Sequence, residues 1–257
     1  MFSGGSISII PSVILLIWVF KNRILPLESK GRAAAVSATC VVLLIMAAFI
    51  QVTFMIFSGM MSEEAFNNVM SDNAGNIDPF MTIFENVVVV GITEEMTKFL
   101  AVYICTRGMK SSRTSGEYVL YALISASTFV IIENLLYSLS QGLEGWLLRA
   151  LYSGPLHCVV TLFAVFSLLK AREKKNPFIF IGGMLVSILI HGLSNSVLFI
   201  TADMENGETI DFLYTLFSIV LLDVTLVSML VGFRRDVRRS LLESSGFDDR
   251  ILHPSVR

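Results

Sequence analysis

Seven apolar blocks constrain the fold of this chain more than any other feature of its sequence. They cover residues 6–20, 33–57, 80–105, 118–141, 151–169, 177–200 and 211–233. An apolar stretch of about 18 residues or more is long enough to cross a bilayer as a helix. Only 16% of the 257 residues are charged, whereas soluble domains carry roughly 25%. The sequence therefore predicts an all-α fold, a polytopic transmembrane bundle of about seven spans.

The basic residues predict the orientation of this bundle. Seventeen of the 19 Lys and Arg residues follow the first, third and fifth blocks or lie in the C-terminal tail, and the other loops are acidic. Lys and Arg concentrate in cytoplasmic loops. We therefore expect an extracytoplasmic N-terminus and a cytoplasmic C-terminus. The resulting organisation is two N-terminal helices (1–57), an extracytoplasmic loop (58–79), a four-helix core (80–200), a loop with the last helix (201–233) and a basic cytoplasmic tail (234–257).

Composition also limits the partners. The formal net charge is only −2 and no basic domain is present, so nucleic acid is not an expected partner. The lipid bilayer is the expected surrounding of the apolar blocks. Cys40, Cys105 and Cys158 all lie inside apolar blocks, which predicts buried thiols and no disulfide framework.

Ionisable side chains inside the apolar blocks are the most informative residues, because they are costly in a bilayer and usually functional. With a helical rise of 1.5 Å per residue, Glu94, Glu95, Glu133, His157 and His191 lie roughly 15–22 Å above the inner ends of their helices. We therefore expect Glu95, Glu133, His157 and His191 to converge on one intramembrane cavity. The ionisable set consists of Glu94, Glu95 and Lys98 in the third block, Glu133 in the fourth, His157 in the fifth, His191 in the sixth and Asp223 in the seventh, and the polar Asn195 lies one turn from His191.

These side chains suit hydrolytic chemistry. Two histidines and a carboxylate form a common divalent-metal set with one position left for water, so His157, His191 and Glu133 are the expected ligands of a divalent metal, zinc by its preference for such donors. Glu94 or Glu95 is then the general base, and Asn195 steadies a ligand or polarises a carbonyl oxygen. Two other readings stay open, a metal-free glutamate–histidine site and a purely structural Glu94–Lys98 ion pair.

Four motifs in order resemble those of the PrsW family of intramembrane proteases, relatives of the CAAX prenyl endopeptidases. The resemblance covers about Phe80 to Phe199, and the motifs are Glu94-Glu95-Met96-Thr97-Lys98, Phe129 to Glu133 followed by Asn134, Ser153 to His157, and His191 to Asn195. It implies a membrane-embedded endopeptidase of the prokaryotic plasma membrane that cuts a membrane-anchored protein, such as an anti-sigma factor. It also implies that the two glutamates of the first motif, Glu133 and both histidines act in catalysis.

Three other functions fit parts of the pattern. An ion- or proton-coupled transporter would use Glu94, Glu95, Glu133 and Asp223 as a relay. A haem-binding electron carrier would use His157 and His191 as axial ligands. A non-catalytic membrane sensor would fit the span count alone.

Overall fold

The computed structural model describes residues 30–57, 79–107, 115–140, 143–202 and 207–244. This part of the chain is helical and contains no strand. Its helices are α3 (Lys30–Phe57), α5 (Pro79–Phe84), α6 (Ile92–Thr106), α7 (Ser115–Ser140), α8 (Leu143–Lys174), α9 (Pro177–Ala202) and α10 (Gly207–Ser244), with a π-helical segment η1 (Glu85–Gly91) between α5 and α6. The predicted first span, almost all of the 58–79 loop and the end of the tail lie outside the described residues.

The all-helical prediction is confirmed for the described residues. Four of their helices are long and apolar enough to cross a membrane, with apolar stretches at Gly31–Phe54, Glu117–Leu136, Tyr152–Lys174 and Pro177–Leu198. A shorter apolar stretch, Leu216–Gly232, lies in α10. The predicted span at 80–105 corresponds to α5, η1 and α6 together, because the π-helical segment divides it. The total of seven spans and the orientation of the termini stay predictions.

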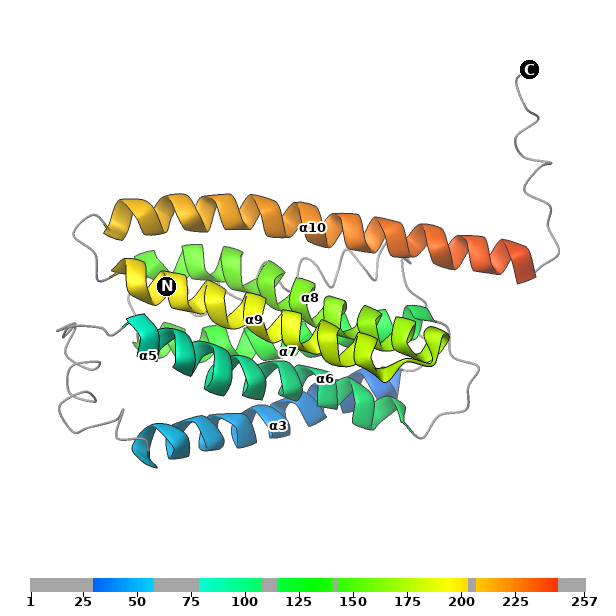
Figure 1. Cartoon of the computed structure of the whole chain (residues 1–257), viewed down its shortest axis with the longest axis horizontal. Coiled ribbons are helices and arrows are strands. Elements are labelled where there is room, and N and C mark those ends of the chain that lie inside the picture. The colour runs from blue at the N-terminus through cyan, green and yellow to red at the C-terminus, as the bar shows by residue number, and fades with distance from the viewer. Residues whose placement is uncertain (1–29, 58–78, 108–114, 141–142, 203–206, 245–257) are drawn as a thin grey trace, which may run out of the picture.

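The helices run side by side in one bundle, with α3 along one edge and α10 along the opposite edge (Figure 1). The middle of the bundle is formed by α7 and α8, whose apolar stretches are 72% buried, against 22% for α3 and 33% for α9. The largest apolar cluster joins residues of α3, α6, α7, α8 and α10. Residues of α7 and α8 are therefore the best placed to meet inside the protein.

Polar side chains join neighbouring helices at several points. Ser125 of α7 donates to the backbone oxygen of Lys98 at 2.9 Å, and Ser187 of α9 donates to that of Val160 at 2.9 Å. Such small polar residues let helix backbones approach closely in a membrane and link them through hydrogen bonds. Both bonds lie close to the ionisable residues, so they help to fix the relative positions of the helices that carry them.

The turn between α8 and α9 has a clear local cause. Lys175 adopts a left-handed conformation with φ of 51°, and the backbone N–H of Asn176 donates to the Ala171 oxygen at 2.9 Å, which closes the end of α8. The Asn176 side chain then accepts from the N–H of Phe178 at 3.0 Å and caps α9, where Pro177 is the first residue. This tight connection makes α8 and α9 antiparallel neighbours.

Gly154 and Pro155 come just before His157, which predicts an irregular entrance to this helix near the outer surface. That expectation is wrong. Pro155 lies inside α8, which runs without interruption from Leu143 to Lys174. A proline is tolerated within a membrane helix when neighbouring helices and polar side chains satisfy the backbone groups that it frees.

Candidate active site

Glu95 and Lys98 form a buried ion pair on α6. Their side chains are 1% and 0% exposed, and Lys98 Nζ donates to Glu95 Oε1. Residues three apart share one face of a helix, so the pair forms within a single turn. The alternative pairing of Lys98 with Glu94, which the sequence allows equally well, is not the one found. Glu94 instead contacts His191 of α9.

His191 is fixed by contacts to both of its ring nitrogens. Its Nδ1 lies 2.7 Å from Glu95 Oε1, and its Nε2 lies 3.2 Å from Asn195 Nδ2 and 3.5 Å from Glu94 Oε2. Because Nδ1 donates to the carboxylate, Nε2 carries the lone pair. A carboxylate that holds one nitrogen in this way is the usual support of a metal-binding histidine. His191 therefore presents Nε2 toward Glu94 in a form that can bind a metal.

His157 lies next to His191 and also has a partner at each nitrogen. Its Nδ1 is 2.6 Å from Lys98 Nζ, and its Nε2 is 3.0 Å from Glu133 Oε2. The ammonium donates to Nδ1, so Nε2–H donates to Glu133. The two imidazole rings meet edge to face with centroids 4.7 Å apart. Lys98 thus connects the two histidines, through His157 directly and through Glu95 to His191.

A divalent metal fits the donors of this cluster. One ligand atom from each of Glu94, His157 and His191 lies within 4.8 Å of the other two, and all three residues are buried. Glu94 Oε2 and Glu95 Oε2 are buried without a hydrogen-bond partner among the described residues. Buried carboxylate oxygens are rarely left in that state. Two imidazoles and a carboxylate are a donor set that zinc and similar ions prefer.

The backbone before Glu94 has an unusual form that brings α6 close to α9. Residues Glu85–Gly91 form a π-helical segment, a feature often found at functional sites. Thr93 stabilises its end by donating to the backbone oxygen of Val89 at 2.7 Å. On α9, Gly192 faces this segment so closely that a Cβ on it would lie 2.5 Å from Val87 Cα. A glycine beside His191 therefore permits the contact between η1 and α9 that places His191 against Glu95.

A single added methyl group at residue 192 is expected to disturb this contact. In Gly192→Ala the new carbon meets backbone atoms of η1, which cannot move as a side chain can. Overpacking of this kind costs about 1–3 kcal/mol. We expect a lower melting temperature in detergent and slower cleavage. Gly182→Ala is the matched control on the same helix, because its Cβ would meet nothing within 4 Å. Equal melting temperatures for the two variants would contradict the close packing.

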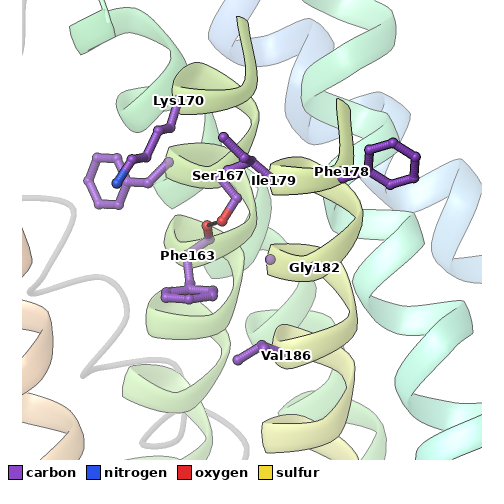
Figure 2. A pocket seen from close by; sticks show the side chains of 9 residues that line it. Phe163, Ser167, Lys170, Phe178, Ile179, Gly182 and Val186 are labelled. Carbon is purple, nitrogen blue, oxygen red and sulfur yellow. Dashed lines mark hydrogen bonds between the residues drawn. The ribbon is translucent and has the colours of Figure 1, made fainter. Parts of the chain in front are cut away.

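Two hollows lie near the helices that carry the cluster, and the smaller one reaches it. A cavity of about 140 Å³ is bordered by Glu94 and Glu133. A larger groove of about 390 Å³ lies between α8 and α9, and its lining includes Phe163, Ser167 and Lys170 of α8 and Gly182 and Val186 of α9 (Figure 2). No Glu or His residue lines that groove. The smaller cavity is therefore the better candidate for the active site, because carboxylates line it and none lines the larger groove.

The structure brings together Glu94, Glu95, Glu133, His157, His191 and Asn195, the six site residues predicted from the sequence. The three residues close enough to hold one metal ion differ from the predicted ligand set in one member. They include Glu94 in place of Glu133. Asp223 is exposed on α10 and not buried as these residues are, which argues against its part in a transporter relay. The edge-to-face contact of the two imidazoles leaves no space for a porphyrin between them, which excludes the haem reading.

Lys98 has a larger part in the site than the sequence suggested. The sequence predicts only a possible ion pair of Lys98 with Glu94, yet Lys98 contacts both Glu95 and His157 and its Nζ lies 4.9 Å from the centre of the Phe129 ring. The position of Lys98 at the end of the first motif is the one feature of the sequence that indicates a part in the site. Gln51 and Thr93, which link α3 to α6 through a 2.8 Å hydrogen bond, carried no signal because neither is ionisable.

Comparison with known proteins identifies the family. A family model described as PrsW family intramembrane metalloprotease matches residues 33–225. The matched stretch includes every residue of the glutamate–histidine cluster on α6, α7, α8 and α9. No curated protein and no solved structure matches the chain. Since the match spans well over half of the sequence, the chain belongs to the PrsW family of intramembrane metalloproteases.

Proposed function

We propose that this protein is a zinc-dependent endopeptidase that cuts a membrane-anchored protein within or next to the bilayer. The observation that carries the proposal is the buried group of Glu94, His157 and His191, beside which Glu133 borders a cavity. A peptide bond needs an activated water and a site that stabilises the charge developing on its carbonyl oxygen. The donors and acceptors of this cluster suit both tasks.

His157, His191 and Glu94 are the proposed metal ligands, and His157 would bind through Nε2 in its other tautomer, with the proton on Nδ1 and the Lys98 contact released. A bound divalent ion would polarise the carbonyl group and make water a usable nucleophile near neutral pH. Glu95 orients His191 through its 2.7 Å contact with Nδ1. Lys98 holds Glu95 in turn, so the ion pair positions a ligand and does not itself meet the substrate.

Glu133 is the proposed general base, and Asn195 the proposed donor to the substrate carbonyl oxygen. Glu133 lines the cavity beside Glu94 and is 11% exposed, so a water molecule can reach it. Its 3.0 Å contact with His157 Nε2 holds the Glu133 carboxylate beside the proposed metal ligands. Asn195 is partly exposed, and its amide lies 3.2 Å from His191 Nε2. The assignment exchanges Glu94 and Glu133 relative to the sequence-based expectation, because Glu94 is the carboxylate that lies within reach of both imidazoles.

Within this function, we expect an anti-sigma factor or another single-span protein as the substrate, cut on its extracytoplasmic side in a prokaryotic plasma membrane. The family resemblance of the motifs supports this choice. A single-span substrate also suits a site enclosed by helices, since such a protein can approach through the bilayer. One fold can serve several substrates, so the substrate itself is best found by screening.

The proposed topology has seven spans with the N-terminus outside. The contact of Arg32 with Glu117 at 3.5 Å and that of Arg172 with Tyr118 at 2.8 Å support the orientation, because they join the basic ends of α3 and α8 at one end of the bundle. We expect reporter fusions at 170–176 to report cytoplasm and fusions at 201–209 to report the outside. Reversed reporters would overturn the orientation and the proposed side of cleavage.

Metal removal tests the proposed function. The purified protein is reconstituted into liposomes with a panel of single-span membrane proteins, and mass spectrometry identifies the products. We expect cleavage of at least one panel member, loss of that cleavage after treatment with a chelator, and recovery on addition of zinc. Cleavage that survives complete metal removal, verified by elemental analysis, would favour the metal-free glutamate–histidine mechanism.

A further inference from the structure

A cavity of about 140 Å³ connects the catalytic carboxylates to the surface of the bundle between α3 and α7. One wall comes from α3 and the other from α6 and α7. It is lined by Leu44, Ala47, Ala48, Gln51, Glu94, Phe129, Glu133 and Leu136. Ala48 and Leu136 are both exposed, so the cavity has an edge that faces the lipid. At its other end are the two carboxylates.

The lining divides into an apolar part and an acidic part. Leu44 and Phe129 are buried at 8% and 3% exposure, and Ala47 is buried at 5%. The acidic part consists of Glu94 and Glu133. A cavity with apolar walls favours an apolar occupant, and the carboxylates at its end disfavour an acidic one. The size is comparable to that of an apolar protein cavity of about 150 Å³ that holds a benzene molecule.

We infer that this cavity is the specificity subsite, which receives one aliphatic or aromatic side chain of the substrate next to the cleaved bond, and that the substrate reaches it from the lipid between α3 and α7. The inference rests on the proposed function. A side chain seated between Ala48 and Phe129 would hold its own backbone beside Glu94 and Glu133. Occupying the subsite therefore also orients the peptide bond for attack.

Two alanines on α3 set the size of the subsite. Ala47 and Ala48 leave space that a larger residue at either position would fill. The position of α3 is held by Gln51, which donates to Thr93 Oγ1 at 2.8 Å, one residue before Glu94. The alanine wall is thus fixed relative to the catalytic carboxylates. We expect the protein to prefer a substrate residue of Leu or Phe size at one position and to reject Asp and Glu there.

Replacing Ala48 by a larger residue tests the inference. Ala48→Phe fills the subsite, and Ala48→Val fills part of it with less risk to folding. Met46→Phe is the matched control, since Met46 is 55% exposed and does not line the cavity. Each variant is reconstituted with versions of one cleaved substrate that carry Ala, Leu, Phe or Glu at each position around the cut, and kcat/KM is measured for each version.

For the wild type and Met46→Phe, we expect the Leu and Phe versions to be cleaved fastest at one position. One misfitted group in an apolar pocket changes kcat/KM by about 10–200-fold. For Ala48→Phe, we expect kcat/KM to fall by that factor for the Leu and Phe versions and to stay unchanged for the Ala version. The kcat/KM values of Ala48→Val should lie between those of the wild type and Ala48→Phe. An unchanged preference in both Ala48 variants would overturn the inference, as would an equal loss for all side chains in folded protein. Absence of cleavage by the wild type would instead reject the proposed function.

Discussion

Glu94→Gln is expected to lower the rate of peptide cleavage by at least about 10–100-fold, the usual cost of weakening the support of a bound metal. The amide keeps the size of the side chain but is a weak metal ligand, and it removes a negative charge from the group formed with His157 and His191. Loss of the metal would enlarge the effect. The fold should persist, because Glu94 Oε2 has no hydrogen bond to lose among the described residues. Removing a buried charge can even raise the melting temperature.

Asp223→Asn is the control for this substitution. It removes another carboxylate from an apolar helix, but Asp223 is exposed on α10. We expect wild-type cleavage from Asp223→Asn, and a melting temperature no lower than that of the wild type from both variants. If the Glu94→Gln variant were folded and cut its substrate at the wild-type rate, Glu94 would have no part in the chemistry. If Asp223 relayed protons to the site, the Asp223→Asn variant would instead lose cleavage.

Lys98→Met is expected to destabilise the protein by about 3–5 kcal/mol, the usual cost of breaking a buried ion pair by removing one partner. The substitution leaves Glu95 buried at 1% exposure without its cation. It also removes the donor that lies 2.6 Å from His157 Nδ1. We expect a large fall in the free energy of unfolding in mixed detergent micelles, together with a loss of cleavage.

A double variant separates the ion pair from other effects. Glu95→Gln/Lys98→Met removes both charges, and we expect it to be more stable than Lys98→Met alone. Lys174→Met is a surface control, because Lys174 pairs with Glu173 at 3.5 Å while both side chains are more than half exposed. A pair of that kind contributes no more than about 1 kcal/mol. A double variant as unstable as Lys98→Met would show that the pair itself does not account for the loss.

The helices and their polar residues could be predicted because both follow from short-range patterns. Apolar blocks set the approximate limits of α3, α7, α8 and α9, and ionisable residues within them marked the site. The depth of each residue along its helix was enough to predict that Glu95, Glu133, His157 and His191 meet. The contacts His157–Glu133 and His191–Glu95 confirm this meeting.

The pairing within the site could not be predicted in the same way. Lys98 is three residues from Glu95 and four from Glu94, and both spacings share a helix face. The choice depends on His191, which approaches from α9 and bonds Glu95. That approach depends on Gly192 and on the π-helical segment η1. Neither feature has a periodic signature, so local sequence cannot reveal which glutamate joins the two histidines in the group close enough to hold one metal ion.

The packing of α3 beside the site could not be predicted from the sequence either. Its residues are mostly apolar, and more than 20 residues separate it from the start of α5. Nothing in a pattern of Leu and Ala indicates which helix it will touch. In the structure, Thr97 and Gln51 connect it to α6 through contacts of 3.5 Å and 2.8 Å. This placement turns Ala47 and Ala48 into the wall of a cavity beside two carboxylates.

Cleavage in heavy-oxygen water by the purified protein in liposomes tests the central claim most directly. Hydrolysis transfers one oxygen atom from water to the new carboxyl terminus, and mass spectrometry of the products detects it. We expect one heavy oxygen atom per cut for the wild type and for Asp223→Asn, and no product above background for Glu94→Gln and His191→Ala. Labelled product formed equally by all four proteins would come from a contaminant or another site, and would contradict the assignment of hydrolysis to the buried glutamate–histidine cluster.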